Sequence, residues 1–210
     1  MTVGAKGFIR YSGMALVCML FNGQTQAVSL SIPPLMTASE LLTQLNQHLI
    51  NSKNAPATLD SWCHSYLASP TALTVNSVTE PTPPLPDTVR QQLHIGPQTQ
   101  PRYLKLQYQC DNKVVAVFEH WYLPKMLPSE IEAQMLDHPV SFGRELRKLG
   151  YYRQNLSYSP LWPKSDAGSL PAIVLQQQAM LYRNDKTPFS VVSEHYSRQL
   201  LPMAQQLDPY

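Results

Sequence analysis

Residues 102–110 alternate between two kinds of side chain, and this period of two constrains the fold more than any other feature of the chain. In an extended strand, such alternation places apolar side chains on one face and polar ones on the other. The apolar face holds Leu104, Leu106, Tyr108 and Cys110, and the opposite face holds Tyr103, Lys105, Gln107 and Gln109. A polar turn at residues 111–113 and a second apolar run at 114–123 follow. The two runs therefore predict an antiparallel hairpin.

Similar patterns predict the rest of a sheet and its helices. Helix signals lie near the N-terminus at residues 39–51 and 60–67, and two further helices are expected at 128–136 and 142–150. Strands are predicted at residues 73–78, 102–110, 114–123, 151–158, 172–182 and 189–196. The prolines between Pro81 and Pro101 indicate an irregular connector. The predicted fold class is α+β, a single antiparallel sheet of about six strands with N-terminal helices and two inserted helices.

The composition fits a globular protein and argues against one class of partner. Hydrophobic residues make up 43% of the 210 residues and charged residues only 14%, which supplies enough apolar side chain for a core. The net charge of +2 is too small to favour nucleic acid as the main partner. We therefore expect a monomeric globular protein that does not bind nucleic acid.

The three cysteines, Cys18, Cys63 and Cys110, do not show a metal-binding spacing. The chain has neither a CxxC pair nor a Cys/His pattern of the structural-zinc type. His64 follows Cys63 directly, but adjacent side chains on a helix or strand point apart. We therefore predict no metal site, because a buried thiol is the usual role of such cysteines.

Residues 1–27 resemble a secretory signal. A positive start, an apolar run and a small-residue cleavage site follow one another at Lys6 to Arg10, Met14–Phe21 and Thr25–Ala27. The apolar run is too short to cross a bilayer, so we expect no stable membrane span. Export would remove Cys18 and leave Cys63 and Cys110, an even pair that an oxidising compartment can bridge.

A second interpretation starts the domain at Met36. Thr37 or Ser39 can cap a helix there, and apolar side chains recur at helical spacing at Leu41, Leu42, Leu45 and Leu49. Translation from Met36 would give a complete domain. Residues 1–35 are then a leader or a wrongly assigned start, and residues 36–210 form a single domain. Export and a cytoplasmic location both stay open at this point.

The last predicted hairpin carries one carboxylate, Glu194, on its return strand. Lys105, His120 and Arg153 can face this carboxylate across a single sheet, which would form a small pocket for an anion with one acid–base group beside it. Other interpretations stay open. Glu194 can be exposed to solvent or paired with Lys105, Lys105 can lie on the wet face of its strand, and His120 can be a satisfied core histidine.

The order of several motifs resembles a known family. These motifs are Leu59–Trp62 with Ser69–Thr74, Tyr103–Cys110, Ala116–Pro124, Gly143–Leu146, and Lys186–Pro188 leading to Ser193 and Glu194. In order and spacing they resemble the chorismate lyase family, the chorismate pyruvate-lyases of ubiquinone biosynthesis, and the related effector-binding fold of transcriptional regulators. The resemblance covers roughly residues 59–200.

The resemblance implies an activity. Members of the family convert chorismate into 4-hydroxybenzoate and pyruvate without a cofactor, in a buried site under helical flaps. On this basis we expect a cytoplasmic chorismate pyruvate-lyase that acts on a small-molecule substrate and needs no cofactor. The alternative is a non-catalytic protein on the same fold, cytoplasmic or exported, that binds an aromatic carboxylate.

The resemblance also implies the site residues. Glu194 matches the family's active-site glutamate, and Lys105 takes the place of an arginine that grips a substrate carboxylate, so these two are the expected catalytic residues. The expected substrate-binding residues are Leu73, Phe142, Gly143, His120 and Arg153. His120 falls where another arginine is common. Lysine lacks the planar fork of arginine and histidine is mostly neutral near neutral pH, so a dianionic substrate would be held less firmly than in the family.

Overall fold

The computed structural model describes residues 36–137, 150–162 and 170–202. The chain divides into Met1–Pro34 and Leu35–Tyr210, and all described residues belong to the second unit. Its helices are α1 (Ala38–Asn51), α2 (Ala55–Tyr66), α3 (Asp87–Gln92) and α4 (Ser129–Asp137). Its strands are β1 (Thr74–Ser77), β2 (Arg102–Cys110), β3 (Lys113–Tyr122), β4 (Tyr151–Pro160), β5 (Ile173–Arg183) and β6 (Pro188–Ser197). Two short 3₁₀ turns follow β3 and β6, η1 (Pro124–Met126) and η2 (Arg198–Leu200).

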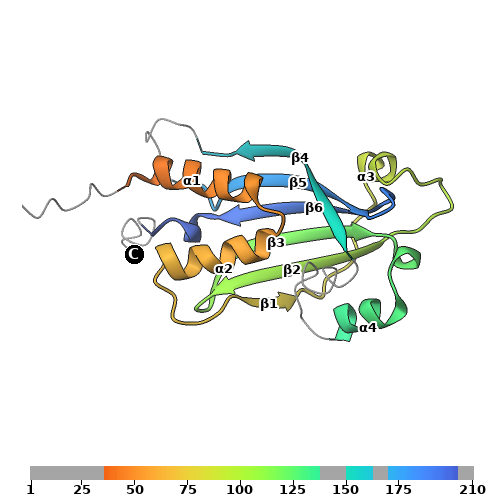
Figure 1. Ribbon diagram of the computed structural model, residues 1–210, viewed down its shortest axis with the longest axis horizontal. Coiled ribbons are helices and arrows are strands. Elements are labelled where there is room, and N and C mark those ends of the chain that lie inside the picture. Colours follow the sequence, from red (N-terminus) through yellow and green to blue (C-terminus); the bar gives the residue numbers. More distant parts are fainter. Residues whose placement is uncertain (1–35, 138–149, 163–169, 203–210) are drawn as a thin grey trace, which may run out of the picture. The chain divides into compact units, whose positions relative to one another are not determined.

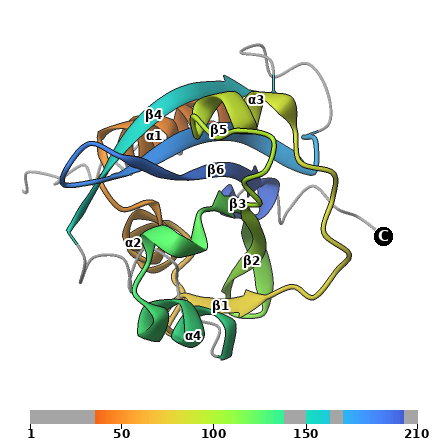
Figure 2. The same ribbon diagram turned by 90° about the vertical axis from the view of Figure 1, so that its right-hand side faces the viewer.

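The six described strands form one sheet in the order β1-β2-β3-β6-β5-β4 (Figure 1). Every neighbouring pair is antiparallel. Figure 2 shows β1 and β4 at the two ends of the sheet. The expected α+β class with a single antiparallel sheet of six strands is therefore confirmed.

The β2–β3 hairpin follows from its turn residues. Cys110 pairs with Lys113, so only Asp111 and Asn112 form the turn. Both have positive φ angles, 45° and 69°, the backbone that a two-residue turn needs and that Asp and Asn tolerate. The Asp111 carboxylate does not close the turn; it accepts hydrogen bonds from the hydroxyls of Ser69 and Thr71, at 2.9 and 2.6 Å.

Helices α1 and α2 lie side by side on one face of the sheet (Figure 1). Thr37 and Glu40 form a reciprocal capping box at the start of α1, which satisfies two backbone N–H groups. The predicted leucine stripe of α1 is buried, at Leu41, Leu42, Leu45 and Leu49. With α2 it covers the apolar face of the strands, where the main core lies.

Two predictions about helices need correction, and a third falls outside the described residues. Helix α2 begins at Ala55 and not after Thr58, because the Asn54 side chain accepts the N–H of Ala57 and caps the helix early. The proline-rich connector contains α3, whose Val89 packs with Leu93, Trp121, Met180 and Val191 in a second apolar cluster. Helix α4 corresponds to the helix expected at residues 128–136. The helix expected at residues 142–150 falls in the range 138–149, which is not described, and at Gly150.

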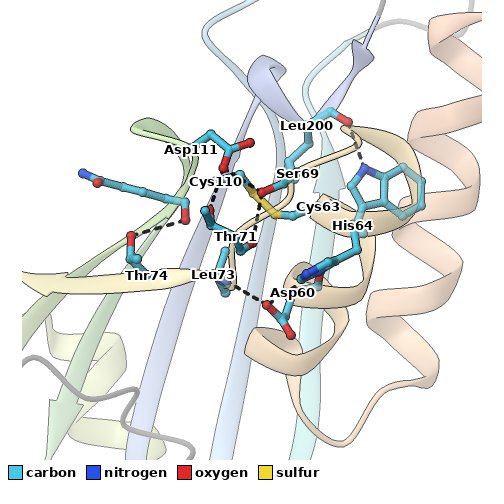
Figure 3. The surroundings of a disulfide bond; sticks show 12 residues. Asp60, Cys63, His64, Ser69, Thr71, Leu73, Thr74, Cys110, Asp111 and Leu200 are labelled. Carbon is cyan, nitrogen blue, oxygen red and sulfur yellow. Dashed lines mark hydrogen bonds and ion pairs between the residues drawn. A yellow bond between two sulfur atoms is a disulfide. The ribbon is translucent and has the colours of Figure 1, made fainter.

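A disulfide joins α2 to the end of β2 (Figure 3). Cys63 and Cys110 are both buried, and their Cα atoms lie 6.1 Å apart. Beside it the Asp60 carboxylate accepts the backbone N–H of Leu73 at 2.8 Å. The bridge therefore fixes α2, the start of β1 and the β2–β3 turn against one another.

We expect removal of this bridge to destabilise the domain. A cross-link between residues 47 positions apart restricts the unfolded chain, and its loss should lower the free energy of unfolding by about 4 kcal/mol. The measurement is denaturant unfolding of the Cys63→Ser, Cys110→Ser double variant, with Ser65→Ala, at an exposed position of α2, as the control. Equal stability of the double variant, the control and the oxidised wild type would contradict a stabilising bridge.

Candidate functional site

Glu194 lies in the middle of the sheet and is almost completely buried. It pairs with Phe118 on β3 and with Gln177 on β5, so it shares their face of the sheet, under α1 and α2. Its exposed fraction is 1%. Glu194 is therefore not a solvent-exposed residue of an edge strand, and its ion-pair partner is not Lys105.

The partner of Glu194 is Arg153 on the edge strand β4. Two guanidinium nitrogens contact the two carboxylate oxygens: Nη1 donates to Oε1, and Nη2 donates to Oε2 at 2.8 Å. The remaining Nε–H donates to Oδ1 of Asn155 at 2.8 Å, and the Tyr196 hydroxyl donates to Oε2 of Glu194 at 2.7 Å. The side chains of Arg153 and Glu194 are 6% and 1% exposed, so this is a bidentate ion pair in the protein interior.

Hydrogen bonds connect helix α1 to the residues around the ion pair. Asn155 Nδ2 donates to the backbone carbonyl of Ile50 at 3.1 Å, which satisfies a carbonyl in the last turn of α1. Gln177 Nε2 donates to Oδ1 of Asn46 at 3.1 Å from the strand position next to Glu194. The end of α1 and the ion pair therefore belong to one hydrogen-bond network.

Burial and charge shape the protonation of this network. Burial alone lowers the pKa of Arg153, but the Glu194 carboxylate outweighs it and holds the pKa above its ordinary value. Burial, and then the Glu194 charge, raise the pKa of Tyr196. Both groups therefore keep their protons, and Arg153 stays cationic. A buried ion pair of this kind is expensive to desolvate, and such arrangements cluster at functional sites.

His120 lies on the same face, on β3, and is 4% exposed. Burial and then the Arg153 charge lower its pKa to about 3. The imidazole is therefore neutral at physiological pH and does not serve as a second cation. A neutral histidine is a hydrogen-bonding group, and it cannot replace the carboxylate-binding charge of an arginine.

A small cavity lies at these residues. Its volume is about 20 Å³, which is room for about one water. The apolar wall consists of Phe118, Leu181 and Val192, the polar groups are Tyr108, His120, Tyr151, Arg153 and Glu194, and the roof is Lys53, Ala55 and Pro56. The roof combines Lys53, in the turn between α1 and α2, with the first two residues of α2, and this part of the helical layer lies over β3 and β6 (Figure 1).

Two larger hollows lie at the surface of the described part of the chain. One, of about 400 Å³, is lined by residues 125–128 and 183–185, and the other, of about 460 Å³, lies between α1 and α2. The charged side chains Arg183 and Asp185 in the first hollow are 48% and 57% exposed. Because buried ionisable groups converge at the small cavity, whereas those of the first hollow are exposed, we place the candidate site at the small cavity.

The expectation that Lys105 faces Glu194 is wrong. Lys105 pairs with Glu119, while its neighbour Leu104 pairs with His120, so Lys105 lies on the opposite face of the sheet. There its Nζ contacts Glu80 at 2.9 Å and Glu119 at 3.7 Å. Its hydrogen bond to Glu80 is the main reason why the pKa of Lys105 is raised. The alternation of residues 102–110 places the lysine there, whatever its match to the family motif.

The other expected residues fall into three groups. His120 and Arg153 lie at the cavity with Glu194. Leu73 is half-buried at the rim of the main core and does not line the cavity. Phe142 and Gly143 lie outside the described residues, so their expected roles stay predictions.

Sequence reasoning missed several residues of the site. Tyr196 and Tyr108 sit at buried positions of alternating strands and looked like ordinary core aromatics. Asn155 and Lys53 carry no motif, and only the tertiary structure brings them to the cavity or to Arg153. The tyrosines had one available signal, since a buried hydroxyl usually needs a partner.

Two further searches concern metals and membranes. Within residues 36–137, 150–162 and 170–202, His, Cys, Asp and Glu do not gather in threes in a way that would hold a metal ion. In the same ranges no helix has both the length and the apolar character needed to cross a bilayer.

The low pKa of His120 predicts a loss of stability in acid. An unfolded histidine titrates near pH 6.5, so the stabilising effect of a neutral His120 is fully present above that pH and is lost as pH falls toward about 3. The loss between about pH 6.5 and pH 5 should be about 2 kcal/mol. Arg153, Glu194, Tyr108 and Tyr196 surround this position, and the arginine disfavours the imidazolium.

Denaturant unfolding at a series of pH values measures this effect. We expect His120→Gln to show a flatter pH dependence than the wild type. The control is His94→Asn, at an exposed position with a φ of 55°, which should follow the wild-type curve. Parallel curves for His120→Gln and the wild type would show that His120 does not cause the acid loss.

Comparison with known proteins gives one relative at the level of sequence. Models of known protein families do not match the chain. The uncharacterized protein y4mC from Sinorhizobium fredii (strain NBRC 101917 / NGR234) is 30% identical over 181 residues, covering 78% of this chain and 76% of that protein.

Solved structures give weaker likenesses. The possible transcriptional regulator YydK from Bacillus subtilis is 17% identical with a TM-score of 0.43, over 61% of this chain and 60% of that one. PhnF from Mycobacterium smegmatis is 12% identical with a TM-score of 0.46, over 62% of this chain and 60% of that one. The effector-binding domain of the B. subtilis trehalose repressor is 9% identical with a TM-score of 0.39, over 65% and 94%. This chain thus spans less than two thirds of the length of YydK and PhnF.

These structural likenesses are too weak to carry information about function. The sequence identity to y4mC is of a different kind, because it extends over three quarters of both proteins. The chain therefore belongs to the same protein family as y4mC of Sinorhizobium fredii.

Proposed function

We propose that this protein binds a small aromatic carboxylate at the cavity beside Arg153 and Glu194. The observation that carries the proposal is the bidentate ion pair itself, 6% and 1% exposed, at the wall of a cavity. The guanidinium fork matches a carboxylate, as its contact with Glu194 demonstrates within the chain. Each Nη atom carries a second N–H beside the one that Glu194 accepts, and a ligand carboxylate would accept a hydrogen bond from such an N–H.

The walls of the cavity favour an aromatic ring on that carboxylate. Phe118, Tyr108 and Tyr151 line it together with two aliphatic side chains, Leu181 and Val192. Such surfaces bind flat apolar groups, while a few polar groups fix their orientation. The present volume of about 20 Å³ is far smaller than a benzene ring, so binding requires the roof over the cavity to move.

The charges favour one carboxylate over two. Arg153 is the buried cation at the cavity, and Lys53 is an exposed one in its roof. The positions that resemble the family's arginines do not add to them, because Lys105 lies on the other face of the sheet and His120 is neutral. A dianion such as chorismate would therefore bind less well than a monocarboxylate.

Chorismate pyruvate-lyase activity is the second candidate function, and Glu194 is the observation that favours it. This residue matches the family's active-site glutamate, and the α+β sheet with its covering helices is consistent with a chorismate-lyase-like domain. In this role Arg153 would orient a substrate carboxylate and Glu194 would assist proton movement. The absence of the family's arginines at Lys105 and His120 argues for the binding role instead.

Calorimetric titration with benzoate and 4-hydroxybenzoate tests the binding proposal. We expect Arg153→Gln to weaken binding by at least about tenfold, because a charge-assisted hydrogen bond contributes on the order of 1.5–3 kcal/mol. Removing Arg153 alone leaves Glu194 buried without its cation, which destabilises the fold. The Arg153→Gln, Glu194→Gln double variant replaces both charges and should fold without binding. Arg102→Gln, at an exposed arginine on β2, is the matched control.

Several outcomes would contradict the proposal. Folded wild-type protein that binds neither benzoate nor 4-hydroxybenzoate would overturn it. Equal binding by the wild type and the double variant would also overturn it. Chorismate is added in parallel, and the product is followed by chromatography. Release of 4-hydroxybenzoate that is lost in Glu194→Gln would establish the lyase in place of the binding role.

We also propose that the domain matures outside the cytoplasm. The cytoplasmic location expected from the lyase chemistry stays a prediction, and the Cys63–Cys110 disulfide favours the alternative, because such bridges persist in oxidising compartments. The secretory pattern of residues 1–27 is an independent observation in the same direction.

Expression of the full chain with its own N-terminus tests this location. We expect the mature protein to begin near Val28 and to contain a bridged pair, which intact-mass measurement before and after reduction will show. The control replaces Leu16 with Arg in the apolar run, which should block processing. A cytoplasmic protein that retains residues 1–27 and carries free thiols would contradict export.

A further inference from the structure

Tyr108 lies at the cavity with its hydroxyl unused by the rest of the described protein. The residue lies near the end of β2, two positions before Cys110, and is 0% exposed. Its hydroxyl has no hydrogen-bond partner among the described residues. Leaving such a group unsatisfied in the interior is destabilising, so a buried hydroxyl of this kind needs an explanation.

The surroundings of Tyr108 fix its ring and relate it to Glu194. Its ring packs on Phe118 with centroids 4.5 Å apart, and Phe118 packs edge-on against Tyr196 at 5.7 Å. Tyr108 and Tyr196 both pair with Ala116, from opposite sides of β3, so the two tyrosines share the helix-covered face. The Tyr196 hydroxyl is occupied by Glu194, whereas that of Tyr108 is not.

We infer that Tyr108 is a specificity-determining residue, whose hydroxyl bonds a second polar group on a ligand held by Arg153. This inference rests on the proposed function and narrows the ligand class to aromatic acids with a hydroxyl or another hydrogen-bonding substituent on the ring. In this arrangement the Arg153 guanidinium binds the ligand carboxylate, Phe118 packs against the ring, and the Tyr108 hydroxyl bonds the ring substituent.

The chemistry of the tyrosine suits this role. Burial, and then the Glu194 charge, raise the pKa of Tyr108 above its ordinary value, so the hydroxyl keeps its proton and both donates and accepts. A site that hydrogen-bonds a substituent also discriminates against the analogue without it, because the buried group then stays unpaired. For one neutral hydrogen bond we expect discrimination of about tenfold.

The competing explanation is that a buried water satisfies the hydroxyl. The cavity volume of about 20 Å³ is sufficient for one water. Under this explanation the hydroxyl does not distinguish ligands. The two explanations therefore predict different results when the ligand substituent and the tyrosine hydroxyl are removed separately and together.

The experiment is a double-mutant cycle between protein and ligand. Benzoate, 3-hydroxybenzoate and 4-hydroxybenzoate are titrated into the wild type, Tyr108→Phe and Tyr158→Phe, a control on the edge strand whose residue is 58% exposed. We expect the wild type and the control to prefer one hydroxybenzoate over benzoate by about tenfold. In Tyr108→Phe that preference should disappear while the affinity for benzoate stays unchanged.

Several results would overturn the inference. Equal affinity of the wild type for all three probes would exclude a hydroxyl-reading subsite without any variant. A preference that persists in Tyr108→Phe, or an equal loss for benzoate and the hydroxybenzoates, would assign the effect to another group or to the fold. In each of these cases benzoate still binds and the proposed function stands. Folded wild-type protein that binds none of the probes would overturn both.

Discussion

A guanidinium and a carboxylate buried in contact with each other connect most of the features of this domain. Arg153 belongs to β4, an edge strand whose Tyr152, Leu156 and Tyr158 are 41%, 37% and 58% exposed. Such a strand gains little stability from burying apolar surface. Its backbone pairs with β5 only, and Arg153 is the side chain that reaches beyond β5 to Glu194 on β6. The same ion pair thus anchors the edge of the sheet and supplies the charge at the cavity.

The period of two along the strands places two groups of ion pairs on opposite faces of the sheet. Under the helices, Arg153 and Glu194 neutralise each other in a nearly dry environment. On the opposite face, Lys105 lies with Glu80 and Glu119, whose side chains are 34% and 32% exposed, so solvent screens these contacts. An ion pair of the first kind is costly to expose or break, whereas one of the second kind contributes little. The geometry therefore directs a search for function to the covered face.

The sequence was sufficient for the sheet but not for all of the site. Alternation and turn residues predicted the β2–β3 hairpin to within one residue, since β3 begins at Lys113 and not at Val114, and the leucine spacing predicted α1. The short α3 was missed, because the prolines before it indicate a connector and Val89 within it is held by Trp121 and Val191 from distant strands. The placement of Lys105 was wrong because the alternation along β2, and not a match to a family motif, decides on which face of the sheet a side chain lies.

Some features of the site were likewise predicted from the sequence, and others depend on the tertiary structure. Glu194 and Arg153 were both named from sequence, but their contact depends on β4 lying next to β5 and β5 next to β6, which local patterns do not specify. The burial of His120 and its neutral state follow from that packing and not from residue type. Tyr108 was assigned to the apolar face correctly. That its hydroxyl has no hydrogen-bond partner among the described residues could be seen only from the tertiary structure.

Helices α1 and α2 differ in how they are attached to the sheet. Helix α2 is joined to β2 by the disulfide, and its Trp62 donates to the backbone carbonyl of Leu200 at 2.9 Å. Helix α1 contacts the strands through its leucine stripe and through side-chain hydrogen bonds of Asn46 and Gln177. Lys53 in the roof lies between these two supports and is exposed. An enlargement of the cavity that leaves the disulfide intact therefore involves the roof residues Lys53, Ala55 and Pro56. The end of α1 next to this roof is connected to Arg153, because Asn155 on β4 bonds both the Ile50 carbonyl and the guanidinium.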